Sequence, residues 1–186
     1  MLKIITAAET FDLTTIERVR RDLKIAGGPD DVFLGDAIRE ESARLARWCR
    51  RVLARETVEQ TEYLERTAET LLLERYPNIQ ITSVVEGGTA LAPTEYEVDD
   101  DKGRLYRLEG NSRTSWAATR IVATYAAGYA LPAGVPSDVE SACVRLVAAR
   151  WFARARDPLV KSLDVAGVAR EDYWIGAPGD DGPPDG

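Results

Sequence analysis

The sequence predicts an α+β fold in which a helical core of three helices carries a small inserted antiparallel β-sheet. Apolar residues recur at helical spacing near the N-terminus and again after residue 137. Between these regions, short β-branched and aromatic stretches follow one another, separated by turns that contain glycine. The last residues are rich in glycine, proline and aspartate, a composition that cannot build a hydrophobic core. We therefore expect a flexible C-terminal tail after the folded domain.

Two helices are expected near the N-terminus, over about residues 15–26 and 31–55. The sequence Gly27-Gly28-Pro29 separates them, because glycine and proline favour turns over helix. Glu41 falls within the apolar face of the second helix, and a buried carboxylate needs a cationic partner. We expect an arginine from elsewhere in the chain, or from another copy of it, to supply that partner.

The opposite side of the second helix is basic, with arginines spread over residues 39–51. A basic helix face can contact DNA or an acidic partner. It is more often a solvated face held by ion pairs within the helix, such as Glu40 with Arg44. The sequence leaves both a binding face and a solvated face open.

Residues 57–126 are expected to form the inserted sheet. The best strand in this region is 79–85, and Gly87-Gly88 predicts a tight hairpin directly after it. Further strands are expected at 94–98 and 104–108. Antiparallel pairing is favoured because sequential short strands are joined by tight turns.

A third helix, over about residues 137–156, is expected to be long and unusually apolar. Val139, Cys143 and Leu146 mark one face, while Trp151 and Phe152 lie on other faces at 100° per residue. A helix with apolar side chains on most sides is either central to a core or packed between its own domain and a partner. Composition alone favours the core.

The composition lacks residues that several common kinds of catalytic site require. The chain has no histidine, which is the commonest general base and a frequent zinc ligand. It has no glycine-rich phosphate-binding loop and no ligand spacing typical of a metal site. Cys49 and Cys143 fall on predicted apolar faces, so we expect buried hydrophobic residues rather than a disulfide or a nucleophile. We expect no enzymatic activity, no metal and no cofactor.

The net charge of -7 argues against a protein that coats nucleic acid, because such proteins are normally basic. No apolar run approaches the roughly 20 residues needed to span a bilayer. The N-terminus also lacks the pattern of a signal peptide. These features predict a protein that is made in the cytoplasm and does not bind membranes.

Residues 158–186 are expected to form a tail beyond a domain at residues 1–157. Tyr173, Trp174 and Ile175 make a compact aromatic patch at the head of this tail. An aromatic anchor on a flexible segment is typical of a chain end that docks into a groove on another protein. Folding back onto its own domain is the alternative.

Several motifs together resemble the head-to-tail connector (adaptor) proteins of long-tailed phages, prophages and gene transfer agents. These motifs are Ile-Thr-Ser-Val at 81–84, Thr-Tyr-Ala-Ala-Gly-Tyr at 124–129, Val-Pro-Ser-Asp-Val at 135–139, and Trp151-Phe152 ahead of two arginines. The resemblance covers about residues 13–157 and depends on the order and spacing of the motifs rather than on any one of them.

The resemblance implies a structural protein that forms a ring, of twelve copies, beneath the portal protein of a tailed particle. The ring would extend the DNA channel without reading sequence and would receive a downstream stopper or tail-proximal protein. After synthesis in the cytoplasm, the protein would end in the particle neck.

Exposed aromatic and apolar side chains are expected at its protein interfaces: Trp151, Phe152, Tyr173, Trp174 and Ile175. Charged residues of the second helix are candidates for contacts between subunits or along the channel: Glu41, Arg44, Arg47 and Arg51. The alternative function is a small cytoplasmic binding or regulatory module that uses the basic face of residues 39–51. That alternative predicts tight, salt-dependent binding of DNA.

Overall fold

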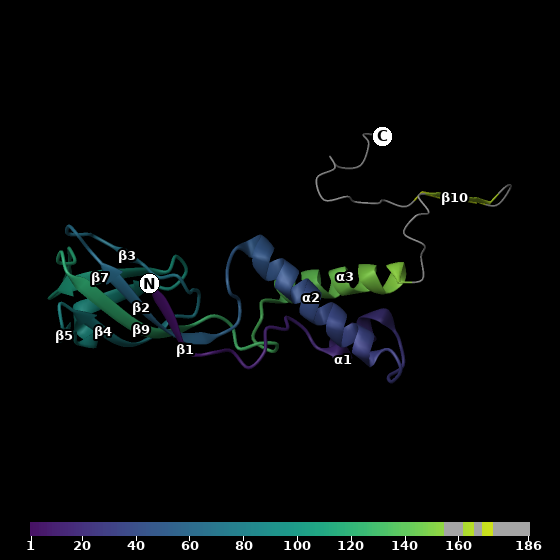
Figure 1. Cartoon of the computed structure of the whole chain (residues 1–186), viewed down its shortest axis with the longest axis horizontal. Coiled ribbons are helices and arrows are strands. Elements are labelled where there is room, and N and C mark those ends of the chain that lie inside the picture. Colours follow the sequence, from purple (N-terminus) through teal and green to yellow (C-terminus); the bar gives the residue numbers. More distant parts are fainter. Residues whose placement is uncertain (155–161, 166–168, 173–186) are drawn as a thin grey trace.

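The computed structural model describes residues 1–154, 162–165 and 169–172. Residues 1–154 form an elongated molecule with a β half at one end and a helical half at the other (Figure 1). The chain crosses between the halves three times, at residues 7–15, 50–55 and 128–136. Both halves are therefore assembled from segments that lie far apart in the sequence.

Three helices form the helical half: α1 (Ile16–Leu23), α2 (Asp31–Cys49) and α3 (Ser137–Ala153). Thr15 caps α1, its hydroxyl oxygen accepting a hydrogen bond from the backbone N–H of Arg18 at 3.2 Å. The residues that follow α1 and α2, Lys24 and Arg50, have φ values of 55° and 52°. This left-handed conformation ends both helices. None of these helices is long and apolar enough to cross a membrane.

The helices bury one hydrophobic cluster between them. It contains Val19 from α1, Leu34 and Ile38 from α2, and Cys143 and Val147 from α3. Along α2 and α3, buried side chains recur at helical spacing on one face of the helix. The far side of α3 leaves Ala149, Phe152 and Ala153 exposed, so the described residues do not surround α3 on all sides.

Five strands form the larger sheet of the β half, and all neighbouring pairs are antiparallel. Their order is β1 (Leu2–Thr6), β2 (Glu56–Tyr63), β9 (Arg120–Ala127), β4 (Gln80–Glu86) and β5 (Thr89–Ala90). β2 and β9 pair along their whole length, from Glu56 opposite Ala127 to Tyr63 opposite Arg120. The centre of this sheet is therefore made by two strands about 60 residues apart in sequence.

A second, four-stranded sheet is formed by β3 (Leu71–Leu72), β7 (Arg104–Glu109) and β6 (Tyr96–Asp99), with β8 (Ser112–Thr114) also pairing with β7. A short 3₁₀ helix, Pro93–Glu95, leads into β6.

The two sheets share a second hydrophobic cluster. Val58, Val84 and Ile121 come from the larger sheet and Leu105 from the smaller one. Trp116 is fully buried in this cluster, and its indole N–H donates a hydrogen bond to the Leu105 carbonyl oxygen at 3.2 Å.

Two of the crossing segments are hydrogen-bonded side by side. The Arg55 N–H donates to the Tyr129 carbonyl oxygen at 2.9 Å, and the Tyr129 N–H donates to the Leu53 carbonyl oxygen at 2.8 Å. Gly128 makes this approach possible, because it has a φ of 105° and a Cβ placed on it would lie 2.5 Å from the Ala54 carbonyl oxygen. A residue with a side chain would meet both a strained φ and a clash with the backbone.

The expected fold class is wrong. Helix and strand contents are about equal, the β half has its own hydrophobic cluster, and its sheets have five and four strands. They do not form a small insertion into a helical core. The described residues also contain no long C-terminal helix, because the helix at this position, α3, has 17 residues and ends at Ala153. The sequence pattern missed β1 and the pairing of β2 with β9, because such pairings depend on distant partners.

Two further strands, β10 (Ser162–Val165) and β11 (Ala169–Asp172), pair with each other within the region expected to be a flexible tail. The aromatic patch of that region, Tyr173, Trp174 and Ile175, lies outside the described residues.

Candidate functional site

Glu41 is buried in the face of α2 that packs on the other helices, with 5% of its surface exposed. Its carboxylate accepts a hydrogen bond from Arg44 Nη1 at 3.1 Å. On α3, Arg150 Nη1 lies 3.7 Å from the other carboxylate oxygen. Arginines of the same chain thus supply the partners that a buried carboxylate requires.

Arg150 also donates a hydrogen bond to Glu40, which is the neighbour of Glu41 on α2. That hydrogen bond raises the pKa of Arg150 above its usual value, so the guanidinium stays charged. Arg150 therefore links α3 to two carboxylates of α2.

A groove of about 730 Å³ lies between α2 and α3 directly beside these ion pairs, and we call it the α2–α3 groove. Its apolar lining consists of Ala43, Leu146, Ala149 and Ala153. Its charged lining consists of Glu40, Glu41, Arg44, Arg47 and Arg150. The structure thus places three of the four charged residues singled out from the sequence, Glu41, Arg44 and Arg47, at one surface.

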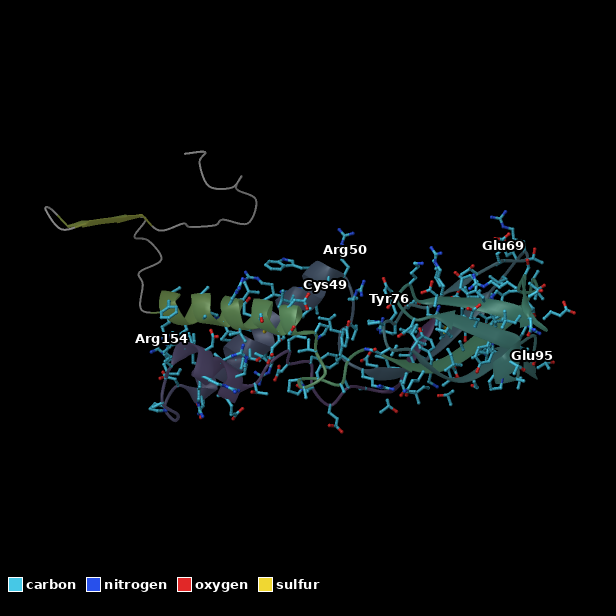
Figure 2. The ribbon with its side chains drawn as sticks, turned by 180° about the vertical axis from the view of Figure 1, so that it is seen from behind. Cys49, Arg50, Glu69, Tyr76, Glu95 and Arg154 are labelled. Carbon is cyan, nitrogen blue, oxygen red and sulfur yellow. The ribbon has the colours of Figure 1, made fainter. Side chains whose placement is uncertain are left out.

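The fourth residue, Arg51, lies apart from that groove. Its guanidinium is 4.5 Å from the centre of the Tyr76 ring and donates a hydrogen bond to the Tyr76 hydroxyl oxygen at 3.2 Å. Figure 2 shows Arg50 at the inner end of the helical half, near Tyr76 of the β half. Arg51 therefore connects the two halves through a cation–π contact with Tyr76. The sequence pattern did not reveal this contact.

Trp48 is exposed over 65% of its surface, and the Arg44 guanidinium lies 5.7 Å from the centre of its ring. The sequence pattern did not identify Trp48 as a contact residue. In the sequence, Trp48 falls at the edge of the apolar face of α2, and this position indicates that the other helices do not bury it. An exposed tryptophan beside arginines is typical of a contact surface.

The two aromatic residues selected on α3 have different environments. Trp151 packs edge-on against Phe33, with 6.0 Å between the two ring centres. The guanidinium group of Arg154 lies 3.4 Å from the centre of the Trp151 ring. Phe152 is 74% exposed. Trp151 therefore belongs largely to the helical half itself, whereas Phe152 is available to a partner. Figure 2 shows Arg154 at the outer end of the helical half.

Among the described residues, no group of three or more Cys, Asp or Glu side chains is arranged to hold a metal ion. Cys143 is buried as expected, and burial raises the pKa of its thiol, so the unreactive protonated form is favoured. Cys49 is exposed, so its expected burial is wrong. The helix ends at this residue, which removes the continuing apolar face that would have covered it.

No protein-family model matches the sequence, and no curated protein matches it. Solved structures of gene transfer agent (GTA) particles contain chains with the same fold. A chain in the virion of the native GTA particle has a TM-score of 0.58 and 19% identity, with 84% of this chain and 87% of that chain covered.

Chains in two GTA necks agree with this match. In the neck of the native particle, computed with C12 symmetry, the TM-score is 0.57 and the identity 19%. In the neck of the empty particle, computed with C6 symmetry, the values are 0.56 and 18%. Both matches cover 84% of this chain and 86% of the other. The protein shares its fold with chains of the GTA neck.

Proposed function

We propose that this chain is a structural protein in the neck of a tailed phage or phage-like particle. The observation that carries this proposal is the fold shared with chains of GTA necks over 84% of this chain and 86% of theirs. A match of this extent includes residues from both halves of the molecule. The chain would act in the assembled particle, at the interface between head and tail.

Within the neck, we propose a head-to-tail adaptor that forms a ring beneath the portal protein, extends the DNA channel and receives the next tail-proximal protein. Twelve copies would fit the C12 symmetry used for the native GTA neck. A ring closes when one surface of each subunit contacts a different surface of the next. The ring would have no catalytic role, and the acidic net charge would limit adhesion of the DNA passing through it.

Exposed apolar side chains support an assembled state. Phe152 on α3 and Trp48 on α2 are large and mostly in solvent, and Val32 near the start of α2 is exposed as well. Large exposed apolar groups are often covered by partners. Phe152 remains our candidate for a subunit or portal contact.

The alternative, a DNA-binding module built on residues 39–51, is not favoured, because three arginines of this region already have partners within the chain. Arg39 donates to Asp36 at 2.8 Å, Arg44 to Glu41, and Arg51 to Tyr76. Partnered guanidinium groups have fewer donors free for phosphates.

The test is to tag the chain in cells that produce the particle, recover its complexes, and identify them by mass spectrometry and negative-stain microscopy. We expect the portal protein and ring-shaped complexes. A deletion strain should produce heads without attached tails, and the wild-type gene should restore tailed particles. Normal tailed particles from the deletion strain would rule out the neck function. Recovery of a monomer that binds DNA in a salt-dependent way would support the alternative.

A further inference from the structure

The α2–α3 groove has the composition of a docking surface for a peptide. Its floor carries small side chains, with Ala43 and Ala149 exposed to solvent and Leu146 between them and the core. Its volume of about 730 Å³ exceeds that of a single side chain. An extended segment bearing apolar side chains would fit such a surface.

The rim of the groove carries three arginines and two glutamates, so arginines are in excess by one. Arg44 and Arg150 are partly exposed and face the carboxylates of Glu41 and Glu40. Arg47 is exposed, and within the described chain it forms no ion pair. The exposed ring of Trp48 follows directly on α2. Arginines beside an aromatic ring favour an acidic ligand that also carries aromatic groups.

This chain itself contains a segment of that chemistry. After Arg170 the sequence has no lysine or arginine, but it has acidic residues: Glu171, Asp172, Asp180, Asp181 and Asp185. Three apolar residues follow the first two acids: Tyr173, Trp174 and Ile175. We propose that the C-terminal segment, residues 173–186, docks into the α2–α3 groove of its own subunit. Its acids would face Arg47, the rim arginine that forms no ion pair among the described residues, and its aromatic residues would face the alanine floor.

The length of the chain allows this docking. Ala153, the last residue of α3, already lines the groove. In the β10–β11 pair, Ser162 lies opposite Asp172, so the start of the C-terminal segment returns beside residue 162. The nine residues from 154 to 162 can span about 30 Å. The distance from Ala153 to Leu146 along the helix is only about 10 Å.

The short stretch of chain that joins α3 to the C-terminal segment also favours docking within the same subunit over docking into another copy. A ligand joined by a short linker has an effective concentration in the millimolar range. This exceeds the concentration that separate protein copies reach in dilute solution. The contact does not depend on the proposed neck function, although in a neck protein it would cover the groove until a partner displaced the segment.

The experiment measures binding of a fluorescent peptide with the sequence of residues 173–186 by fluorescence anisotropy. One protein sample is the full chain and the other ends at residue 172. Both hydrophobic clusters lie within residues 1–154, so the shortened chain keeps them. We expect the shortened chain to bind the peptide with a Kd of about 10–100 μM, and more weakly as salt is raised. The full chain should bind at least about tenfold more weakly, because its own segment occupies the groove.

Variants of the shortened chain test the position of the site. Arg47→Glu and Trp48→Ala should each weaken binding about tenfold or more. Arg21→Glu is the matched control, because it makes the same charge change at an exposed position on α1, outside the groove. It should leave Kd unchanged. A peptide with Trp174→Ala should also bind more weakly, and circular dichroism should show that each protein variant keeps its helices.

Four results would overturn the proposal. The shortened chain could fail to bind the peptide, or the full chain could bind it equally well. Arg21→Glu could weaken binding as much as Arg47→Glu, which would indicate attraction to overall charge. Sedimentation could show the full chain as a dimer that becomes a monomer on truncation, which would place the segment on a second copy.

Discussion

The hydroxyl of Tyr125 donates a hydrogen bond to Oε1 of Gln60 at 2.7 Å, inside the hydrophobic cluster of the β half. Gln60 is held in place because its amide nitrogen donates to the Leu72 carbonyl oxygen and its Oε1 also accepts from the Glu74 N–H. Burial raises the pKa of Tyr125 to about 12, because a phenolate here would be a charge in apolar surroundings. This polar network ties β9 to β2 and to the segment after β3.

Tyr125→Phe should change how stability depends on alkaline pH. The protonated hydroxyl is favoured by the fold, so its contribution is full below the unfolded pKa of about 10 and is lost as pH rises towards 12. Over that range the native chain should lose on the order of 2–3 kcal/mol more unfolding free energy than the variant. Near neutral pH the variant should be about 1 kcal/mol less stable, because one buried hydrogen bond is lost.

Urea unfolding of both proteins at a series of pH values from 8 to 12 measures this difference. Tyr63→Phe is the control, because Tyr63 is mostly exposed and its hydroxyl can reach water. It should follow the native curve. Parallel curves for the native chain and Tyr125→Phe would contradict the assignment of the pKa shift to burial.

Local patterns predicted those parts of the fold that depend on neighbours in sequence. The hairpin at Gly87-Gly88 is confirmed, with Glu86 paired to Thr89, because two adjacent glycines accept the φ values of a tight turn. The β half could not be predicted in the same way. Strand β1 lies at a sheet edge with four exposed residues, so it shows no clear alternation of apolar and polar residues.

For the α2–α3 groove, the sequence likewise predicted the features that depend on one helix, but not those that depend on how two helices pack. The position of Glu41 within an apolar face required a cation nearby, but the choice of Arg150, 109 residues later, depends on how α3 packs on α2. Helical spacing separated Trp151 from Phe152 by 100° without showing which of these faces another helix covers. The structure decides this, because Phe33 covers Trp151.

Glu41→Ala should lower the unfolding free energy by about 1–2 kcal/mol. The change removes a buried carboxylate from two arginines, and the partial exposure of those arginines limits the cost to less than that of a fully buried pair. The matched variant is Glu40→Ala, which removes an exposed carboxylate from the same Arg150. It should cost no more than about 0.5 kcal/mol. Urea midpoints measure both, and an equal or larger loss for Glu40→Ala would contradict the prediction.

Trp151→Ala and Phe152→Ala should separate folding from assembly. Trp151→Ala should lower the unfolding free energy by about 2–3 kcal/mol, because it removes a ring that packs against Phe33 and Arg154. Phe152→Ala should change stability by less than about 0.5 kcal/mol, since the side chain is mostly in solvent. If Phe152 forms a neck contact, this variant should fold normally and be depleted from purified particles.

Thermal unfolding and quantitative mass spectrometry of purified particles give the two measurements. Val32→Ala offers a second exposed apolar position for comparison, on α2 rather than α3. A stable Phe152→Ala chain that enters particles at the native level would remove Phe152 from the set of interface residues. A strongly destabilised one would show that Phe152 contributes to the fold.

Gly128→Ala should lower the unfolding free energy by about 3 kcal/mol or more, because the added Cβ would lie 2.5 Å from the Ala54 carbonyl oxygen at a φ of 105°. Gly110→Ala separates the effect of the positive φ from the effect of the steric clash. Gly110 also has a positive φ, of 61°, but a Cβ there would have no atom within 4 Å. It should cost only about 1 kcal/mol, the strain of the left-handed conformation. Urea unfolding measures both, and hydrogen exchange at the Arg55 and Tyr129 amides reports on the junction between the halves. Equal losses for the two variants would mean that backbone strain, and not the close approach of the crossing segments, makes Gly128 necessary.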